Sequence, residues 1–167
     1  MVLPGKKLVA LHAGSGSRKK CWPIDGYDKL ITWLHTVKDV QVLLISGYAD
    51  TGIVEELRVR GNDAFIPVDN LPLSVLSAVI KQCNFFVGND SGTTHLAAAL
   101  GTPTIAIFGP TDPGTWGPRG SRVKILYKKS PCSPCHADIR RDCFSQTCLE
   151  NVTLEDVISE IRYINLV

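Results

Sequence analysis

The stretch that decides the fold reads Phe85-Phe-Val-Gly-Asn-Asp-Ser-Gly-Thr-Thr-His-Leu-Ala-Ala-Ala-Leu-Gly101. Its first three residues form a short apolar run, which is typical of a strand buried on both faces of a parallel sheet. Gly88-Asn89 ends that strand, and Asp90 or Ser91 is placed to cap a helix predicted over 92–100. A strand that leads directly into a helix is typical of an α/β fold. Because the first N–H groups of a helix have no partner within it, this turn also predicts an anion site.

The same alternation of strand and helix runs along the rest of the chain. Other buried strands are predicted at Leu8–Leu11, Val42–Ile45, Thr104–Phe108 and Val123–Leu126, with a short one at Ala64–Ile66. Apolar residues recur with helical spacing over 27–34, 76–83 and 154–161, and a weaker helix is predicted over 49–60. Strands joined through helices form right-handed crossovers, so the expected fold class is α/β, a Rossmann-like doubly wound parallel sheet. Such sheets bind ligands at the carboxyl ends of their strands, where the strand order reverses.

Length and composition are those of an ordinary globular domain. The chain has 167 residues, 44% hydrophobic and 20% charged, which suits one domain over residues 1–167. Its 18 Lys and Arg against 16 Asp and Glu give a net charge of +2, too balanced for the basic stripe of a nucleic-acid-binding protein. No apolar run approaches the roughly 18 residues of a membrane span, and the first residues do not resemble a signal peptide. We expect a soluble, cytoplasmic protein with no nucleic-acid partner.

Small and basic residues follow the first predicted strand. They are Gly14, Ser15, Gly16, Ser17, Arg18, Lys19 and Lys20. Glycines let backbone N–H groups approach an anion closely, serine hydroxyls add donors, and basic side chains supply charge for phosphate oxygens. The spacing of a Walker A loop is absent. The stretch predicts a phosphate site of another kind, with a solvated basic turn as the alternative, and Trp22 is expected to pack the next helix rather than stack on a base.

The helix start in the opening stretch supplies further candidates. Gly92 removes a side chain where a ligand must come close, and Thr93 and His95 lie in the first turn. Asp90 has a plain alternative as a helix cap, and His95 has one as a structural histidine. Because both glycine-rich junctions follow buried strands, they emerge at one sheet edge, which favours a shared ligand.

A third polar turn, Gly109-Pro-Thr-Asp-Pro113, follows another buried strand. Prolines stiffen it. Thr111 and Asp112 offer polar groups either to sugar hydroxyls or to the turn itself, and the sequence does not separate these two uses.

Four cysteines gather in a loop predicted over 131–149, namely Cys132, Cys135, Cys143 and Cys148. Two and four residues separate the members of each pair, which fits a four-thiolate zinc site formally, with His136 as an alternative ligand. Disulfides formed on oxidation are a second outcome, and free or partly paired thiols are a third. We favour the thiols, so zinc is disfavoured and no metal is expected.

Taken together, these segments resemble glycosyltransferase family 9, the bacterial heptosyltransferases that act on lipopolysaccharide core. The matching pieces are His12-Ala-Gly-Ser-Gly-Ser17 with Lys20-Cys-Trp-Pro23, then Gly88–Gly101, then Phe108–Pro113. Their order and spacing also match. The resemblance implies the C-terminal, donor-binding half of a GT-B glycosyltransferase, in which two Rossmann-like halves face each other across a cleft.

The resemblance also implies roles for residues at matching positions. Ser15 and its neighbours would contact the diphosphate of an ADP-heptose-type donor, Lys20 would offset the charge of the leaving group, and Asp90 would bind sugar hydroxyls. Asp50 loosely matches a ribose-binding carboxylate, with Glu55 as the next choice. The implied donor-binding set is Gly14, Ser15, Gly16, Ser17, Lys20, Asp50, Leu73 (at the adenine), Asp90, Ser91, Gly92, Thr93 and His95, with Lys20 and Asp90 as its catalytic members.

The implied reaction is an inverting displacement at the anomeric carbon that needs no metal. The general base and the site for a lipid-linked core oligosaccharide belong to an N-terminal half for which this chain has no second Rossmann-like pattern. We therefore expect a fragment or a natural half-protein that binds donor without completing transfer, with at most peripheral association at the inner face of the inner membrane. Two rival functions are a sugar-nucleotide epimerase half and a metal or redox interaction module built on the cysteine loop.

Overall fold

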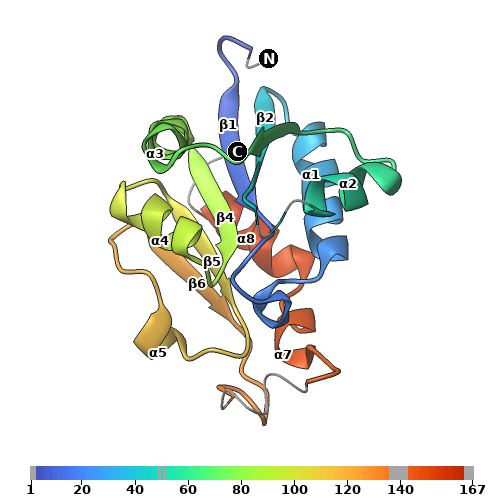
Figure 1. Cartoon of the computed structure of the whole chain (residues 1–167), viewed down its shortest axis with the longest axis vertical. Coiled ribbons are helices and arrows are strands. Elements are labelled where there is room, and N and C mark those ends of the chain that lie inside the picture. Colours follow the sequence, from blue (N-terminus) through green and yellow to red (C-terminus); the bar gives the residue numbers. More distant parts are fainter. Residues whose placement is uncertain (1–2, 49, 51, 136–142, 164–167) are drawn as a thin grey trace.

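The structure, a computed structural model, describes residues 3–48, 50, 52–135 and 143–163. Within them, six parallel strands form one sheet in the order β3-β2-β1-β4-β5-β6 (Figure 1). The strands are β1 (Lys7–His12), β2 (Val40–Ser46), β3 (Ile66–Asp69), β4 (Phe85–Asn89), β5 (Thr104–Phe108) and β6 (Val123–Tyr127). The predicted Rossmann-like, doubly wound parallel sheet is confirmed.

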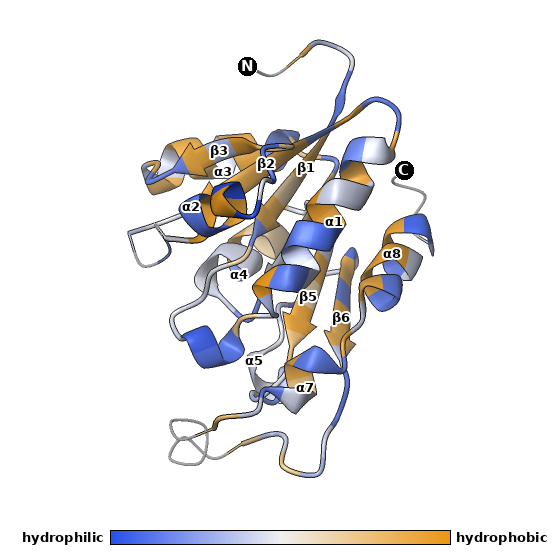
Figure 2. Cartoon of the chain, turned by 90° about the vertical axis from the view of Figure 1, so that its right-hand side faces the viewer, coloured by the Kyte–Doolittle hydropathy of each residue, from blue (hydrophilic) through white to orange (hydrophobic). Residues whose placement is uncertain are grey.

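Helices cover both faces of this sheet (Figures 1 and 2). The longer ones are α1 (Ile24–Thr36), α2 (Gly52–Val59), α3 (Leu73–Gln82), α4 (Gly92–Ala99) and α8 (Leu154–Tyr163), and the short ones are η1 (Arg18–Lys20), α5 (Pro113–Trp116) and α7 (Thr147–Glu150). Val9 and Leu11 of β1 pack in a core with α1, α2 and α8, whereas Ala10 between them packs with α3 and α4. Successive side chains of a strand point to opposite faces, which is why the buried strands carry apolar residues on both faces.

The edge strand β3 differs from its predicted position. The sequence predicted a strand at Ala64–Ile66, but the ladder with β2 pairs Leu43 with Ile66 and runs on to Asp69. Pro67 lies inside the strand, and a proline is tolerated there because an edge strand leaves one side of its backbone unpaired. The strand therefore delivers Asp69 to the same edge of the sheet as the ends of β1 and β2.

The strand order reverses between β1 and β4. The chain leaves β1 for α1 on one face of the sheet and leaves β4 for α4 on the other. His12 and Gly88 are direct partners in the ladder between these strands, so both glycine-rich junctions start at the same level. A doubly wound sheet opens a crevice at such a point.

Among the described residues, no helix is both long enough and apolar enough to cross a lipid bilayer.

Candidate functional site

A cavity of about 290 Å³ lies at the carboxyl ends of β1, β2 and β3, beside the first turn of α4. Its walls come from four separate parts of the chain. They are His12, Ser15, Gly16, Ile45, Ser46, Gly47, Tyr48, Asp50, Val68, Asn70, Leu71, Leu76, Ser91, Gly92 and Thr93. The structure thus brings six of the predicted donor-binding residues into one cavity: Ser15, Gly16, Asp50, Ser91, Gly92 and Thr93.

Asn89, at the end of β4, fixes the first junction to the second. Its amide nitrogen donates to the carbonyls of Ala13 (2.9 Å) and Gly14 (3.1 Å), and its amide oxygen accepts from the Trp22 N–H (2.9 Å) and the Tyr27 hydroxyl (3.1 Å). The side chain is fully buried. Because an amide offers two donors and two lone pairs, every hydrogen-bonding valence is used, and the glycine-rich loop is held at both ends.

The loop itself turns tightly over η1. Ser17 caps this turn, and its hydroxyl accepts from the Lys19 N–H. The Lys19 ammonium donates to the carbonyl of Cys143 in the cysteine segment. Trp22 is buried, meets Tyr27 edge to face at 5.1 Å, and donates its indole N–H to Val152. Trp22 is therefore a packing residue, as predicted.

Lys20 and Asp90 meet across the crevice. The Lys20 ammonium lies 3.1 Å from Asp90 Oδ2, and the Thr111 hydroxyl donates to the same oxygen at 2.8 Å. Ser15 donates to the Asp90 backbone carbonyl at 2.7 Å. The three glycine-rich and proline-rich turns therefore converge on Asp90. The sequence did not decide whether Thr111 and Asp112 serve a sugar or their own turn. The Thr111 hydroxyl faces the Asp90 carboxylate, whereas Asp112 caps α5.

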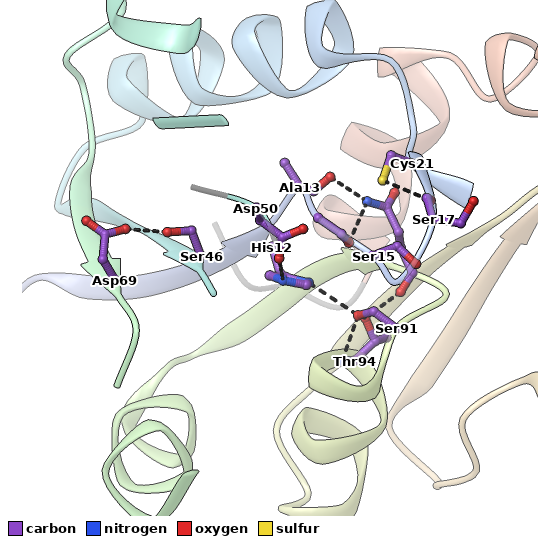
Figure 3. Close-up of polar contacts among 12 residues, drawn as sticks. His12, Ala13, Ser15, Ser17, Cys21, Ser46, Asp50, Asp69, Ser91 and Thr94 are labelled. Carbon is purple, nitrogen blue, oxygen red and sulfur yellow. Dashed lines mark hydrogen bonds and ion pairs between the residues drawn. The ribbon is translucent and has the colours of Figure 1, made fainter. Parts of the chain in front are cut away.

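His12, the last residue of β1, joins two other walls of the cavity (Figure 3). Its Nε2 lies 3.2 Å from Asp50 Oδ2 and its Nδ1 lies 3.2 Å from the Ser91 hydroxyl. Asp50 packs directly on Gly14, where any Cβ would collide with the carboxyl group. Ser46, at the end of β2, also lines the cavity, and its hydroxyl donates to Asp69.

Two glycines of the site have no packing reason to be glycine. A Cβ on Gly16 or Gly92 would meet nothing within 4 Å, although both residues line the cavity. Neither has a positive φ. Bare backbone that faces open space is suited to a ligand that approaches closely, and Gly92 opens α4, whose first N–H groups and positive dipole end favour an anion.

Some predicted residues lie elsewhere. Leu73 begins α3 with 68% of its surface exposed, and it does not line the cavity. Leu71 and Leu76 do so instead, together with Ile45 and Val68. His95 is exposed in the first turn of α4 and also lies outside the cavity walls.

Two groups near the loop stay neutral at ordinary pH. Burial, with the Asp50 charge as the next cause, raises the pKa of the Cys21 thiol to about 11. Burial also raises the pKa of Tyr27 well above its ordinary value. Neither side chain adds negative charge where an anionic ligand would bind.

The four clustered cysteines belong to the segment that contacts the glycine-rich loop through the hydrogen bond from Lys19 to the Cys143 carbonyl. Cys148 is buried, and burial together with the charges of Cys135, Cys132 and Cys143 raises its pKa to about 11. The Cys135 and Cys143 thiols contact the carbonyls of Cys132 and Ser145. No three His, Cys, Asp or Glu side chains of the described residues are arranged to hold a metal ion. His136, the alternative ligand, lies outside the described residues.

Two residues of the site were missed in the sequence. His12 and Asn89 were quoted only as parts of motifs, yet they hold the junctions together. The available signal was a polar residue at the last position of a strand that the sequence predicts to be buried. Such a residue must find hydrogen-bond partners at the sheet edge.

Comparisons with known proteins identify the family of this chain. The model of glycosyltransferase family 9 (heptosyltransferase) matches residues 3–143. Among curated proteins, lipooligosaccharide heptosyltransferase 2 of Campylobacter jejuni is 28% identical over 95% of this chain and 51% of its own length. The chain spans about half the length of the curated relatives it matches over most of its own length.

Solved heptosyltransferases share the fold. Escherichia coli ADP-heptose lps heptosyltransferase II superposes with a TM-score of 0.83 at 21% identity, over 97% of this chain and 47% of that one. E. coli heptosyltransferase WaaC with ADP gives 0.75 at 23% identity, over 95% and 44%. The iron-containing dodecameric glycosyltransferase TibC of enterotoxigenic E. coli gives 0.73 at 18% identity, over 99% and 47%. At these identities the likeness shows the fold alone, which is one half of a GT-B architecture.

Proposed function

Because this chain belongs to glycosyltransferase family 9, we propose that it is the donor-binding half of an inverting heptosyltransferase that takes an ADP-heptose-type nucleotide sugar. The observation that carries the proposal is the pairing of two features at one crevice. Lys20 and the N-terminus of α4 supply positive charge, and the bare backbone of Gly16 and Gly92 faces open space between them. A diphosphate needs this combination of cation and N–H donors.

The nucleoside would lie at the other end of the cavity. Leu71, Leu76 and Val68 offer an apolar surface for a base, and Asp50 offers a carboxylate for ribose hydroxyls. One relative of known structure was solved with ADP and another is described as an ADP-heptose enzyme. Both support an adenine nucleotide as the ligand. Leu73 and His95 remain candidates for parts of the donor that extend beyond the cavity.

The chemistry of this half is electrostatic. When the bond from the anomeric carbon to the diphosphate breaks, negative charge grows on the leaving phosphate, and Lys20 with the α4 N–H groups is placed to stabilise it. Asp90 would hold the sugar, since Lys20 and Thr111 already contact its carboxylate and Ser15 donates to its backbone carbonyl. The general base and the lipid-linked core acceptor would come from a second Rossmann-like half.

We also propose that donor binding needs no metal. Lys20 and the helix N-terminus fill the role that a divalent cation has in other nucleotide-sugar sites, and Asp50, the carboxylate in the cavity wall, is already paired with His12. Treatment with a chelator should therefore leave nucleotide binding unchanged. The likeness to an iron-containing enzyme makes metal analysis of the purified protein a necessary companion measurement, and stoichiometric iron or zinc would contradict the proposal.

Thermal shift with different nucleotides tests the function. ADP and ADP-sugars should raise the melting temperature, because a ligand that binds only the folded state stabilises it by mass action. UDP and GDP should do so less. A larger shift with UDP would favour the epimerase, and no shift with any nucleotide would leave only the cysteine-based module.

Work on membrane fractions should place the full enzyme in the cytoplasm, at most loosely attached to the inner membrane.

A further inference from the structure

His12 occupies a position that the proposed donor chemistry does not yet use. It is 4% exposed, it lines the cavity, and its two ring nitrogens contact residues from two other segments. Asp50 follows β2 and would hold the ribose, whereas Ser91 caps α4 and would face the phosphates. His12 thus connects the two ends of the bound nucleotide (Figure 3).

The contacts around Ser91 restrict which group can donate in each hydrogen bond. The Thr94 hydroxyl donates to the Asn89 carbonyl at 2.5 Å, so its single proton is used. The Ser91 hydroxyl lies 3.1 Å from that Thr94 oxygen and must donate to it. A hydroxyl has one proton, so toward His12, at 3.2 Å, Ser91 can only accept.

Both contacts of the His12 ring are therefore hydrogen bonds only when the ring carries protons on both nitrogens. In that form Nδ1 donates to Ser91 and Nε2 donates to Asp50, because a carboxylate only accepts. With a neutral ring, either the contact to Ser91 or the contact from Ser91 to Thr94 lacks a proton. The imidazolium form alone satisfies every contact of this buried chain.

The charges around His12 also favour its imidazolium form when an anionic ligand binds. The titratable groups around His12 are Asp50, the ion pair of Lys20 with Asp90, Arg18 of η1, and the neutral Cys21 and Tyr27. The Asp50 carboxylate lies in the cavity wall and repels a diphosphate. An imidazolium at His12, 3.2 Å from that carboxylate, offsets its charge.

We propose that His12 is the second cation of the donor site, and that a nucleoside diphosphate binds its imidazolium form and takes up a proton from solvent. The inference rests on the proposed function, since it assumes that the nucleotide occupies this cavity. Histidine is the side chain whose charge ordinarily changes between pH 5 and 8, so the uptake is measurable near neutral pH. His12 is a positioning residue for Asp50 and Ser91 as well as a source of charge.

Calorimetric titration with ADP-glucose tests this. The diphosphate of ADP-glucose is a diester and does not titrate near neutral pH, so any proton taken up comes from the protein. Binding heats in two buffers of different ionisation enthalpy should reveal uptake of a fraction of a proton per site at about pH 7.5. Affinity should weaken at least about threefold between pH 6 and pH 8.5.

His12→Gln should abolish both the uptake and the pH dependence, while His35→Gln, on the exposed end of α1, should keep them. Binding without proton uptake by the wild-type protein overturns the inference and leaves the proposed function standing. Failure of the wild-type protein to bind ADP-glucose or ADP overturns both. If His12→Gln does not fold, ¹⁵N chemical shifts of the wild-type ring decide instead: a ring that stays singly protonated when ADP-glucose binds contradicts the inference.

Discussion

Lys20 and Asp90 lie 70 positions apart in the chain and form an ion pair with 3.1 Å between Nζ and Oδ2. The pair spans the crevice between the two glycine-rich junctions, and its side chains are 20% and 10% exposed. One end of it would meet the phosphates and the other would meet the sugar. The ion pair thus holds the cation and the carboxylate of the site close to each other.

Lys20→Ala should remove most of the thermal shift caused by ADP. The charged hydrogen bond that Lys20 would donate to the phosphates is worth about 1.5–3 kcal/mol, so affinity should fall about tenfold or more. Unfolding free energy should fall by up to about 3 kcal/mol, because the change leaves the Asp90 carboxylate, whose side chain is 10% exposed, without its cation. Lys29→Ala, an exposed change on α1, is the control, and equal loss of ADP binding in both variants would count against a direct role of Lys20.

Two neighbouring glycines should behave oppositely. In Gly14→Ala the new methyl group collides with Asp50, so the contact of Asp50 with His12 breaks and stability falls by about 1–3 kcal/mol. In Gly16→Ala the methyl group meets nothing within 4 Å, so the melting temperature should stay unchanged while ADP binding weakens. Urea denaturation and ADP titration of both variants separate the two effects. Full ADP affinity in Gly16→Ala would show that the ligand does not approach this backbone.

Asn89→Ala should be among the most destabilising changes in the molecule. It removes four hydrogen bonds at once and leaves the Ala13 and Gly14 carbonyls, the Trp22 N–H and the Tyr27 hydroxyl without this partner. Each buried polar group left unsatisfied costs about 1–3 kcal/mol, so a loss of at least about 3 kcal/mol is expected by urea denaturation. Asn151→Ala, an exposed site after α7, should change stability by less than about 0.5 kcal/mol.

Stability should fall at alkaline pH. Burial raises the pKa of Cys83 to about 12 from the ordinary value of 9.0, so in the folded protein this thiol keeps its proton at pH values where the unfolded chain has lost it. The unfolded state then binds fewer protons, and unfolding free energy, complete below about pH 9, declines as pH rises from there toward about 12. Cys21 and Cys148 act in the same direction. Urea denaturation in reductant at several pH values measures the slope, and Cys83→Ala should make it shallower; an unchanged slope would assign the decline to other groups.

The sequence predicted the parallel sheet well because apolar runs without alternation have one common explanation, a strand buried on both faces. Gly16, Ser91 and Gly92 follow such strands, and they line one cavity at the carboxyl edge of the sheet; that they bind a donor stays a prediction. It could not predict that Asn89 and His12 would bind partners far away in the chain, because such contacts depend on how strands pair. Strand pairing also decides that Leu71 and Leu76 reach the cavity while Leu73 faces outward.

The glycine-rich loop that follows β1 is anchored to late parts of the chain. Lys19 reaches the carbonyl of Cys143, 124 positions away, and the Trp22 indole reaches Val152, 130 positions away. Closing such long loops is entropically costly and slow, so contacts of this kind form after local structure. During synthesis the loop is made before Cys143 and Val152, and it can take its final shape only after them. We therefore expect chains that stop before Cys143 to remain unable to bind ADP, however well their strands have folded.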